Sequence, residues 1–196
     1  MNRMLKKFSA LLHAFLAENP KQTEFSFKNR HVLINKKSFL VSRAIVPDIP
    51  ELLKMQEKVY PNDNSWNFGV FEAEIKNKNN NLYLIMRHED RLVAFIGAFF
   101  DRRKRDVHIT NVAVTPIFQR KGLGRYLLEV MIDYADELNY RSLSLEVRLS
   151  NKTAQALYKS LGFTSYGLKK EYYVSNREDA VDMRYEFSRK GNGKNE

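Results

Sequence analysis

Hydrophobic residues recur at two different spacings along this chain, and the two spacings predict different elements. Between residues 122 and 139 the apolar side chains recur three and four positions apart, which predicts a long amphipathic helix. Shorter apolar runs bounded by polar turns predict strands. We expect strands at 38–46, 82–87, 91–100, 106–114, 142–147, 163–173 and 180–187, and further helices from 47 to about 60, at 68–77 and at 151–160.

The order of these elements predicts the fold class. Antiparallel hairpins come first, and the helix at 122–139 then links the strand at 106–114 to the strand at 142–147. A helical crossover of this kind makes the two strands parallel neighbours in one sheet. The expected architecture is therefore α/β (α+β), with a mixed, mostly antiparallel central sheet and helices on both faces.

The N-terminal segment is predicted to be an appendage to this domain. Apolar residues recur at helical spacing until Pro20, and residues 23–34 alternate weakly around a polar turn at 28–30, which indicates a helix followed by a small hairpin. A secretory signal is the alternative, but His13 interrupts the apolar run and no small-x-small cleavage site follows. We assign residues 1–37 to the appendage, 38–188 to the domain and 189–196 to a polar tail.

Composition narrows the classes of function. The 196 residues carry 33 Lys+Arg against 23 Asp+Glu, a formal charge of +10 that suits an anionic cofactor, an RNA-rich partner or both. Cysteine is absent, which excludes disulfides and thiol nucleophiles and suits a reducing compartment, so we expect a cytoplasmic protein. No apolar run is long enough for a membrane helix. The histidines are scattered without metal-ligand spacing, so no metal site is expected; they are His13, His31, His88 and His108.

A loop with two glycines precedes the long helix. Backbone N–H groups in such a strand–loop–helix can approach an anion, and the helix dipole favours negative charge there. The loop lacks the Gly-Lys-Ser/Thr of a P-loop and the G-x-G-x-x-G of a dinucleotide-binding loop, so on its own it fits a tight turn as well as a phosphate site. Its glycines are Gly122 and Gly124, and its cations are Arg120, Lys121 and Arg125.

Motifs on both sides of the loop carry a family resemblance. The stretch Asn111-Val112-Ala113-Val114 leads into Q-x-x-G-x-G at 119–124, and Leu145-Glu146-Val147-Arg148, Ser150-Asn151, Leu157-Tyr158 and Gly162-Phe163 follow the helix. Over residues 38–187 the chain resembles the GNAT superfamily of acetyl-CoA-dependent N-acetyltransferases. The resemblance implies the GNAT fold, in which the central sheet splays between its fourth and fifth strands.

A narrower resemblance is to the RimI type of this superfamily, which acetylates the N-terminal alanine of a small ribosomal-subunit protein. It rests on the Leu-Glu-Val-Arg block with Tyr172-Tyr173 and Glu178-Asp179-Ala180. Tyr60-Pro61 and Trp66 match a Pro-Trp segment of that family, but four residues separate Pro61 from Trp66 here. Residues 1–37 have no counterpart in the shortest members.

The resemblance assigns binding roles. The pyrophosphate of acetyl-CoA would lie on the glycine loop, and its pantetheine arm would pair with the strand at 106–114. Asn151 is a helix cap, a cofactor contact or both. The expected cofactor residues are Val112, Ala113, Val114, Arg120, Lys121, Gly122, Leu123, Gly124, Arg125 and Asn151, and Tyr60, Trp66 and Tyr172 would line the peptide channel.

Two residues are candidates for acid–base chemistry. From spacing alone, Glu146 fits an ordinary glutamate on a polar face or one paired with Arg148, and Tyr158 fits a core tyrosine on the apolar stripe of its helix. The RimI-type motif places its proton acceptor at Glu146 and its proton donor at Tyr158. His108 is expected to be a satisfied strand histidine and not a second base.

The resemblance therefore predicts an N-acetyltransferase that modifies the N-terminal alanine of a protein, with a ribosomal protein as partner. A GNAT enzyme acting on lysine or a small amine is the alternative within this class, because fold does not determine substrate. A basic ribosome- or RNA-associated binding module is the non-enzyme alternative, although such a scaffold has no need of Glu146 and Tyr158 beside an intact loop. RNA contact is compatible with the charge, and the oligomeric state is left open.

Overall fold

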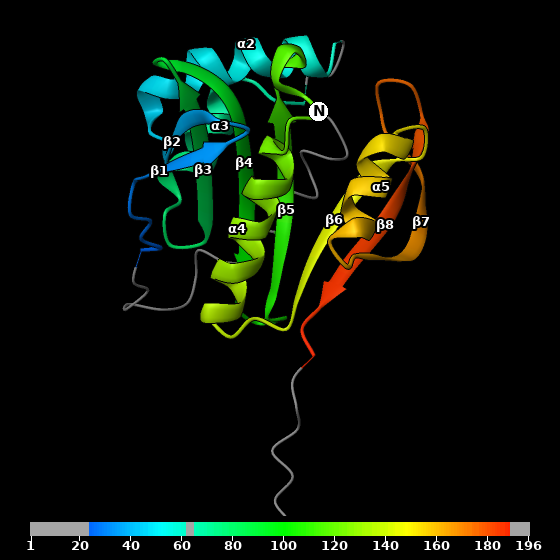
Figure 1. Cartoon of the computed structure of the whole chain (residues 1–196). Coiled ribbons are helices and arrows are strands. Elements are labelled where there is room, and N and C mark those ends of the chain that lie inside the picture. The colour runs from blue at the N-terminus through cyan, green and yellow to red at the C-terminus, as the bar shows by residue number, and fades with distance from the viewer. Residues whose placement is uncertain (1–23, 62–64, 189–196) are drawn as a thin grey trace, which may run out of the picture.

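The computed structural model describes residues 24–61 and 65–188. Their strands form one open sheet in the order β1-β2-β3-β4-β5-β6-β8-β7. Helices α4 and α5 cover one face of the sheet, and α2 and α3 cover the other (Figure 1). The elements are β1 (Arg30–Ile34), β2 (Lys37–Arg43), α2 (Ile49–Val59), α3 (Phe68–Lys76), β3 (Asn81–His88), β4 (Arg91–Asp101), β5 (Asp106–Val114), α4 (Leu123–Glu137), β6 (Ser142–Arg148), α5 (Lys152–Ser160), β7 (Thr164–Tyr173) and β8 (Glu178–Glu186), with short 3-10 turns η1 (Val46–Asp48) and η2 (Pro116–Phe118).

The expected fold class is confirmed. Each strand and helix predicted between residues 38 and 188 is present, with ends that differ by a few residues. The pair β5–β6 is parallel, as the helical crossover requires, and the other neighbouring pairs are antiparallel. No helix within the described ranges combines the length and apolar character needed to cross a membrane.

The predicted hairpin at 23–34 is wrong. The chain turns instead at Asn35 and Lys36, which both have positive φ (50° and 64°), and β1 pairs with β2. Asparagine tolerates this left-handed conformation, which two-residue hairpins require. Phe25 is not in a strand but packs on the core, with its ring centroid 4.2 Å from that of Phe100. The predicted helix before Pro20 and the polar tail lie outside the described residues.

The sheet separates two hydrophobic clusters. The larger one lies under α4 and α5 and includes Leu127, Met131 and Phe100. The smaller one lies under α2 and α3 and includes Phe71 and Phe95. Strands β3 and β4 contribute to both clusters, and this explains why they are apolar almost without interruption. Full burial of one leucine, methionine or phenylalanine side chain contributes about 1.5–3 kcal/mol to the free energy of unfolding.

The sheet opens between β5 and β6. The two strands pair only at Asp106↔Ser142, Val107↔Leu143 and His108↔Ser144, and beyond His108 they diverge (Figure 1). The implied splay between the strands at 106–114 and 142–147 is thereby confirmed. Opposite the split, the β4–β5 register jumps from Ala98↔Ile109 to Gly97↔Asn111 and leaves Thr110 as an extra residue. A bulge of this kind increases local twist, which turns β5 away from β6.

A close contact holds this bulge in place. A Cβ atom at Gly97 would lie 2.3 Å from the ring of Tyr83, so only glycine lets the ring cross β4. The Tyr83 hydroxyl then bonds Thr110 Oγ1 (2.9 Å) and Glu74 Oε2 (3.2 Å). The Tyr83 side chain, from β3, thus connects helix α3 to β5, the strand that borders the opening.

Candidate active site

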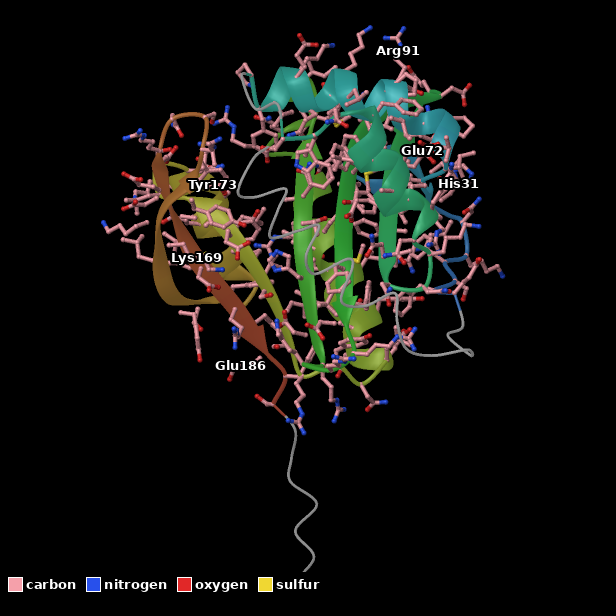
Figure 2. All side chains as sticks on the ribbon, turned by 180° about the vertical axis from the view of Figure 1, so that it is seen from behind. His31, Glu72, Arg91, Lys169, Tyr173 and Glu186 are labelled. Carbon is pink, nitrogen blue, oxygen red and sulfur yellow. The ribbon has the colours of Figure 1, made fainter. Side chains whose placement is uncertain are left out.

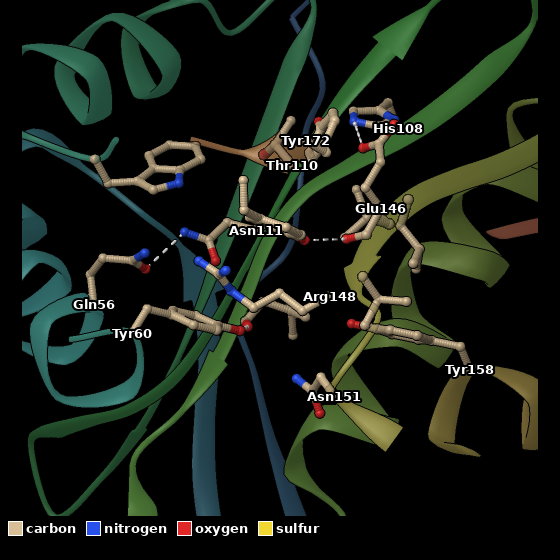
Figure 3. Close-up of a pocket in the computed structure, with 16 residues that line it drawn as sticks. Gln56, Tyr60, His108, Thr110, Asn111, Glu146, Arg148, Asn151, Tyr158 and Tyr172 are labelled. Atoms are coloured by element: carbon tan, nitrogen blue, oxygen red, sulfur yellow. Dashed lines mark hydrogen bonds and ion pairs between the residues drawn. The ribbon is translucent and has the colours of Figure 1, made fainter. Parts of the chain in front are cut away.

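A pocket lies where β5 and β6 separate, and it gathers side chains from both halves of the sheet (Figure 3). Strands β5, β6 and β7 line it together with α2 and α5. On the face opposite α4 and α5, none of the described helices covers the β6–β8–β7 half, so Lys169 and Tyr173 stand on open sheet surface (Figure 2). Of the residues predicted for a site, the pocket brings together Glu146, Tyr158, Val112, Asn151, Tyr60, Trp66 and Tyr172.

Glu146 is held by two side chains, those of His108 and Lys169. Its Oε2 lies 3.2 Å from His108 Nε2, and its Oε1 accepts a hydrogen bond from Lys169 Nζ. Burial on its own would raise the pKa of Glu146, but the hydrogen bonds and charges of His108 and Lys169 outweigh it and lower the pKa to about 2. Glu146 is therefore a carboxylate at neutral pH. Arg148, which spacing alone allows as an ordinary partner of Glu146, bonds Glu178 Oε2 (3.1 Å).

Two tyrosines of β7 complete the surroundings of Glu146. The Tyr173 hydroxyl donates to the backbone carbonyl of Glu146 (3.2 Å). Burial and the charge of Glu146 raise the pKa of Tyr172, whose ring centroid lies 5.7 Å from Lys169 Nζ. Tyr172 thus lines the pocket as a neutral, protonated phenol.

Tyr158 enters the pocket from α5. The residue is 6% exposed and its ring packs against Phe163, with centroids 5.9 Å apart, while its hydroxyl points into the pocket (Figure 3). Within residues 24–61 and 65–188 this hydroxyl has no hydrogen-bond partner. Burial, together with Tyr60 and Tyr173 nearby, raises the pKa of the phenol above its usual value, so it keeps its proton at neutral pH. Tyr158 is therefore both a core residue, as its helical spacing indicates, and a residue whose hydroxyl faces the pocket.

The backbone of β5 faces the opening with alternate residues. Thr115 N–H donates to Val93 C=O on β4 (2.9 Å). Because backbone groups of successive residues in a strand point alternately to its two sides, those of Val112 and Val114 point away from β4 and toward the opening. Their carbonyls do accept side chains there: Val112 from the Tyr60 hydroxyl (2.8 Å) and Val114 from Gln119 Nε2 (3.0 Å). The N–H groups of Val112 and Val114 lie on the same open side.

The glycine loop forms the start of α4. Gly122 is the N-cap residue with φ 89°, and the first backbone hydrogen bond of the helix runs from Tyr126 N–H to Gly122 C=O (2.9 Å). The N–H groups before Tyr126 therefore have no acceptor one turn back in the helix. A Cβ at Gly124 would make only ordinary contact with Val114 Cγ2 (3.5 Å), so the protein itself does not require glycine there. The N–H groups at the start of α4, and a glycine at 124 that packing does not require, both fit a loop that binds an anion.

The remaining predicted residues lie around these. Asn151 caps α5, because its side chain accepts the Ala154 N–H (3.1 Å). The Ala113 side chain points into the smaller core cluster, and by the same alternation its backbone groups face β4 and not the opening. Arg125 bonds Ser160 on α5 and lies 3.4 Å from Glu129. Arg120, Lys121 and Leu123 belong to the loop or the first turn of α4 and lie outside the pocket lining.

Sequence reasoning missed the close neighbours of Glu146. His108 is a satisfied strand histidine, as expected, but Glu146 is one of the groups that satisfy it. The predicted parallel pairing of 106–114 with 142–147 was a signal that the two residues could be close. The observed register places His108 opposite Ser144 and next to Glu146. Lys169 had no such signal, because β7 lies two strands away and reaches Glu146 across β8.

Comparison with known proteins agrees with this geometry. The family described as "Acetyltransferase (GNAT) family" matches residues 48–163. The ribosomal protein bS18-alanine N-acetyltransferase of Salmonella typhimurium is 35% identical over 145 residues, which span 73% of this chain and 94% of that protein. An uncharacterised protein of Mycobacterium leprae is 33% identical over 141 residues, but this chain spans only 38% of its length.

A solved structure extends the match. The crystal structure of the ribosomal-protein-S18-alanine N-acetyltransferase from Escherichia coli superposes with a TM-score of 0.70 at 30% identity, over 79% of this chain and 97% of that one. The family match includes β5, the glycine loop, β6 and α5, which together build the site described above. The chain therefore belongs to the GNAT acetyltransferase family and is an acetyl-CoA-dependent acyltransferase.

Proposed function

We propose that this acyltransferase moves the acetyl group of acetyl-CoA to the α-amine of a protein N-terminus, with alanine as the preferred first residue and a small-subunit ribosomal protein as substrate. One observation carries the proposal: Glu146 and Tyr158, from two different elements, face one pocket where β5 and β6 separate. The two bS18-alanine N-acetyltransferases compared above support the class of substrate.

Glu146 would receive the proton of the attacking amine. An α-amine has a pKa of ~7.7–8.0, so part of it is already neutral near pH 7, whereas a lysine side chain at ~10.4 is almost wholly protonated. The carboxylate of Glu146 attracts the amine and accepts one N–H proton as the new N–C bond forms. This chemistry favours an α-amine over a lysine.

Tyr158 would supply the proton for the leaving sulfur. As the C–S bond of the thioester breaks, its electron pair stays on sulfur, and the phenol proton moves to that atom. Burial raises the pKa of Tyr158, which by itself makes donation harder. The same enclosed surroundings also raise the pKa of the departing thiol, so the pKa of the proton acceptor moves in the same direction as that of the donor.

The open edge of β5 and the glycine loop would hold acetyl-CoA. The N–H groups of Val112 and Val114 face the opening, where an extended arm can pair with them and one of them can polarise the acetyl carbonyl. The N–H groups at the start of α4, with Arg120 and Lys121 beside them, suit the pyrophosphate. The thioester of acetyl-CoA supplies the activated acetyl group.

Aromatic side chains would form the substrate end of the pocket. Tyr60 and Trp66 line it from the α2 side, and Tyr172 lines it from β7. Such walls suit an unbranched, uncharged first residue with its α-amine close to Glu146. One methylene changes binding by only about 1–3 kcal/mol, so serine or glycine in place of alanine should lower the rate without abolishing it.

A panel of peptides tests the proposed function. We expect acetyl transfer to a short peptide that begins with alanine, and much slower transfer to the same peptide when its α-amine is blocked and an internal lysine is left free. Mass spectrometry of the product identifies the acetylated nitrogen. Acetylation confined to lysine, or to a polyamine included as a third acceptor, would contradict the proposal.

A further inference from the structure

A chain of hydrogen bonds leads from the base of the split to Glu146. The hydroxyls of Ser142 and Ser144 both donate to the carboxylate of Asp106. Ser144 Oγ also lies 3.0 Å from His108 Nδ1, and His108 Nε2 lies 3.2 Å from Glu146 Oε2. The chain runs along the last paired residues of β5 and β6, before the strands diverge.

This arrangement determines where the protons are. A serine hydroxyl has a single proton, and that of Ser144 is directed to Asp106, so Ser144 Oγ can only accept from His108 Nδ1–H. At the other ring nitrogen, a lone pair would face the carboxylate of Glu146 at 3.2 Å, which is repulsive unless Nε2 carries a proton. Both hydrogen bonds are satisfied when His108 is an imidazolium with two donors, paired with ionised Glu146.

Glu146 alone is a poor proton acceptor in these surroundings. With its pKa lowered to about 2, it differs by several units from an amine that loses its proton near pH 8. The pair formed by Glu146 and His108 behaves differently, because interacting groups titrate as a unit. Once His108 has lost its Nε2 proton, the pair can bind a proton again at that nitrogen.

We propose that His108 is the positioning residue for Glu146 and the seat of the proton that this site accepts. The proposal rests on the proposed function. The reaction starts from the fraction of protein in which His108 has released its Nε2 proton to solvent. As the amine nitrogen bonds to the acetyl carbon, one N–H bond breaks and its proton passes by way of Glu146 to His108 Nε2. The electron pair of the C–S bond stays on sulfur, which takes the proton of Tyr158. Solvent then returns a proton to Tyr158, and His108 again carries both ring protons, so the protein ends unchanged.

Several charged and titratable groups surround His108, and their effects on its pKa differ in sign. Burial lowers the pKa of His108, while its hydrogen bond to Glu146 and the charges of Glu146 and Asp106 raise it, so the net shift is upward. Lys169 opposes this rise. Burial raises the pKa of Glu74, on α3, to about 7. The groups to be considered from each neighbouring element are Asp106 and Thr110 on β5, Ser144 and Glu146 on β6, Lys169 and Tyr172 on β7, Asp182 on β8 and Glu74 on α3.

NMR titration tests the proton on His108 directly and needs no substrate. In the ¹⁵N spectrum of the full chain, the His108 ring, identified by its loss in His108→Gln, should be doubly protonated at pH 6.5. Its midpoint should lie above ~6.5, the ordinary value for histidine. In Glu146→Gln the midpoint should fall. A His108 ring that is neutral at pH 6.5, or a midpoint that ignores Glu146→Gln, would overturn the proposal.

Kinetics then test the role of that proton. With saturating Ala-peptide, kcat should fall at low pH with a midpoint close to that of the His108 titration, because the reaction needs His108 neutral. His108→Gln keeps a hydrogen-bond donor beside Glu146 but cannot titrate. It should lose that acid limb and at least about tenfold of kcat at pH 8, with KM for acetyl-CoA within twofold of wild type.

Two control variants make the assignment specific. His31→Gln changes an exposed histidine on β1 and should leave the profile unchanged. Glu74→Gln removes a buried carboxyl whose pKa is raised to about 7 and should keep the acid limb. An unaltered acid limb in His108→Gln would overturn the proposal and leave the proposed function standing. If the wild type transfers no acetyl group to the peptide, the proposed function fails with the kinetic half of the inference, and the NMR titration still decides whether His108 holds the proton.

Discussion

Replacing Tyr158 with phenylalanine separates the chemistry of its hydroxyl from the packing of its ring. The residue is 6% exposed, its ring would keep the contact with Phe163, and the hydroxyl has no hydrogen-bond partner among the described residues. Removal of the hydroxyl should change the free energy of unfolding by no more than about 0.5 kcal/mol. Tyr158→Ala instead leaves a cavity and should cost about 3–5 kcal/mol, or roughly 6–20 °C in melting temperature.

The same substitution should have a large effect on turnover. If Tyr158 protonates the leaving sulfur, Tyr158→Phe should lower kcat by ~10²–10⁴. The loss should be constant between pH 7 and 9, because burial raises the pKa of the phenol and keeps it protonated throughout that range.

The assay follows release of the CoA thiol with a chromogenic thiol reagent, and the absence of cysteine in the chain removes the background. A variant that melts like the wild type and retains more than half of its turnover would refute the acid role. A variant that loses stability in proportion to activity would show that the residue is structural.

The other predictions concern the base, the loop and the packing around the split. Glu146→Gln should lower kcat by ~10²–10⁴ with little change in acetyl-CoA affinity by calorimetry, and unchanged turnover at pH 7 would exclude a base role. Gly124→Glu should abolish acetyl-CoA binding in a folded protein, whereas Gly167→Glu, on the open surface of β7, should not; equal binding by both would exclude the loop. Because the pKa of Glu146 is lowered from 4.5 to about 2, its ionisation stabilises the fold above pH 4.5, and up to about 3 kcal/mol should be lost as the pH falls to 2. Acid melts should show a smaller loss in Glu146→Gln, and identical melts would contradict the pairing. Gly97→Ala should cost about 1–3 kcal/mol, because its Cβ would overlap the buried ring of Tyr83, and Gly167→Ala should cost far less; equal melting temperatures would contradict this close packing.

The fold was largely predictable because its signals are local. The apolar spacing within 122–139 reports the face that α4 presents to the sheet, and the crossover through this helix makes β5 and β6 parallel. The N-terminal hairpin was misplaced for an equally physical reason. Weak alternation at 23–34 does not distinguish a pair of strands from a segment whose phenylalanines pack on the core, and the true turn at Asn35 is identified by its left-handed backbone.

The site was predictable only in part. Spacing and family resemblance pointed to Glu146 and Tyr158, and the structure brings both to one pocket. The partners of Glu146 depend on strand register, which no local pattern in the sequence reports. His108 lies 38 positions before Glu146, and Lys169 reaches it from a strand that is not its neighbour in the sheet. The alternative in which Glu146 pairs with Arg148 does not describe the structure, where Arg148 bonds Glu178 at the start of β8.

The central claim is tested most directly by mapping N-terminal acetylation across the proteome of the source organism after deletion of the gene. Mass spectrometry should show loss of the α-acetyl group from a small-subunit ribosomal protein that begins with alanine. The wild-type gene should restore that group, and genes carrying Glu146→Gln or Tyr158→Phe should restore much less of it. Unchanged α-acetylation in the deletion strain, or a loss confined to lysine side chains, would contradict the account.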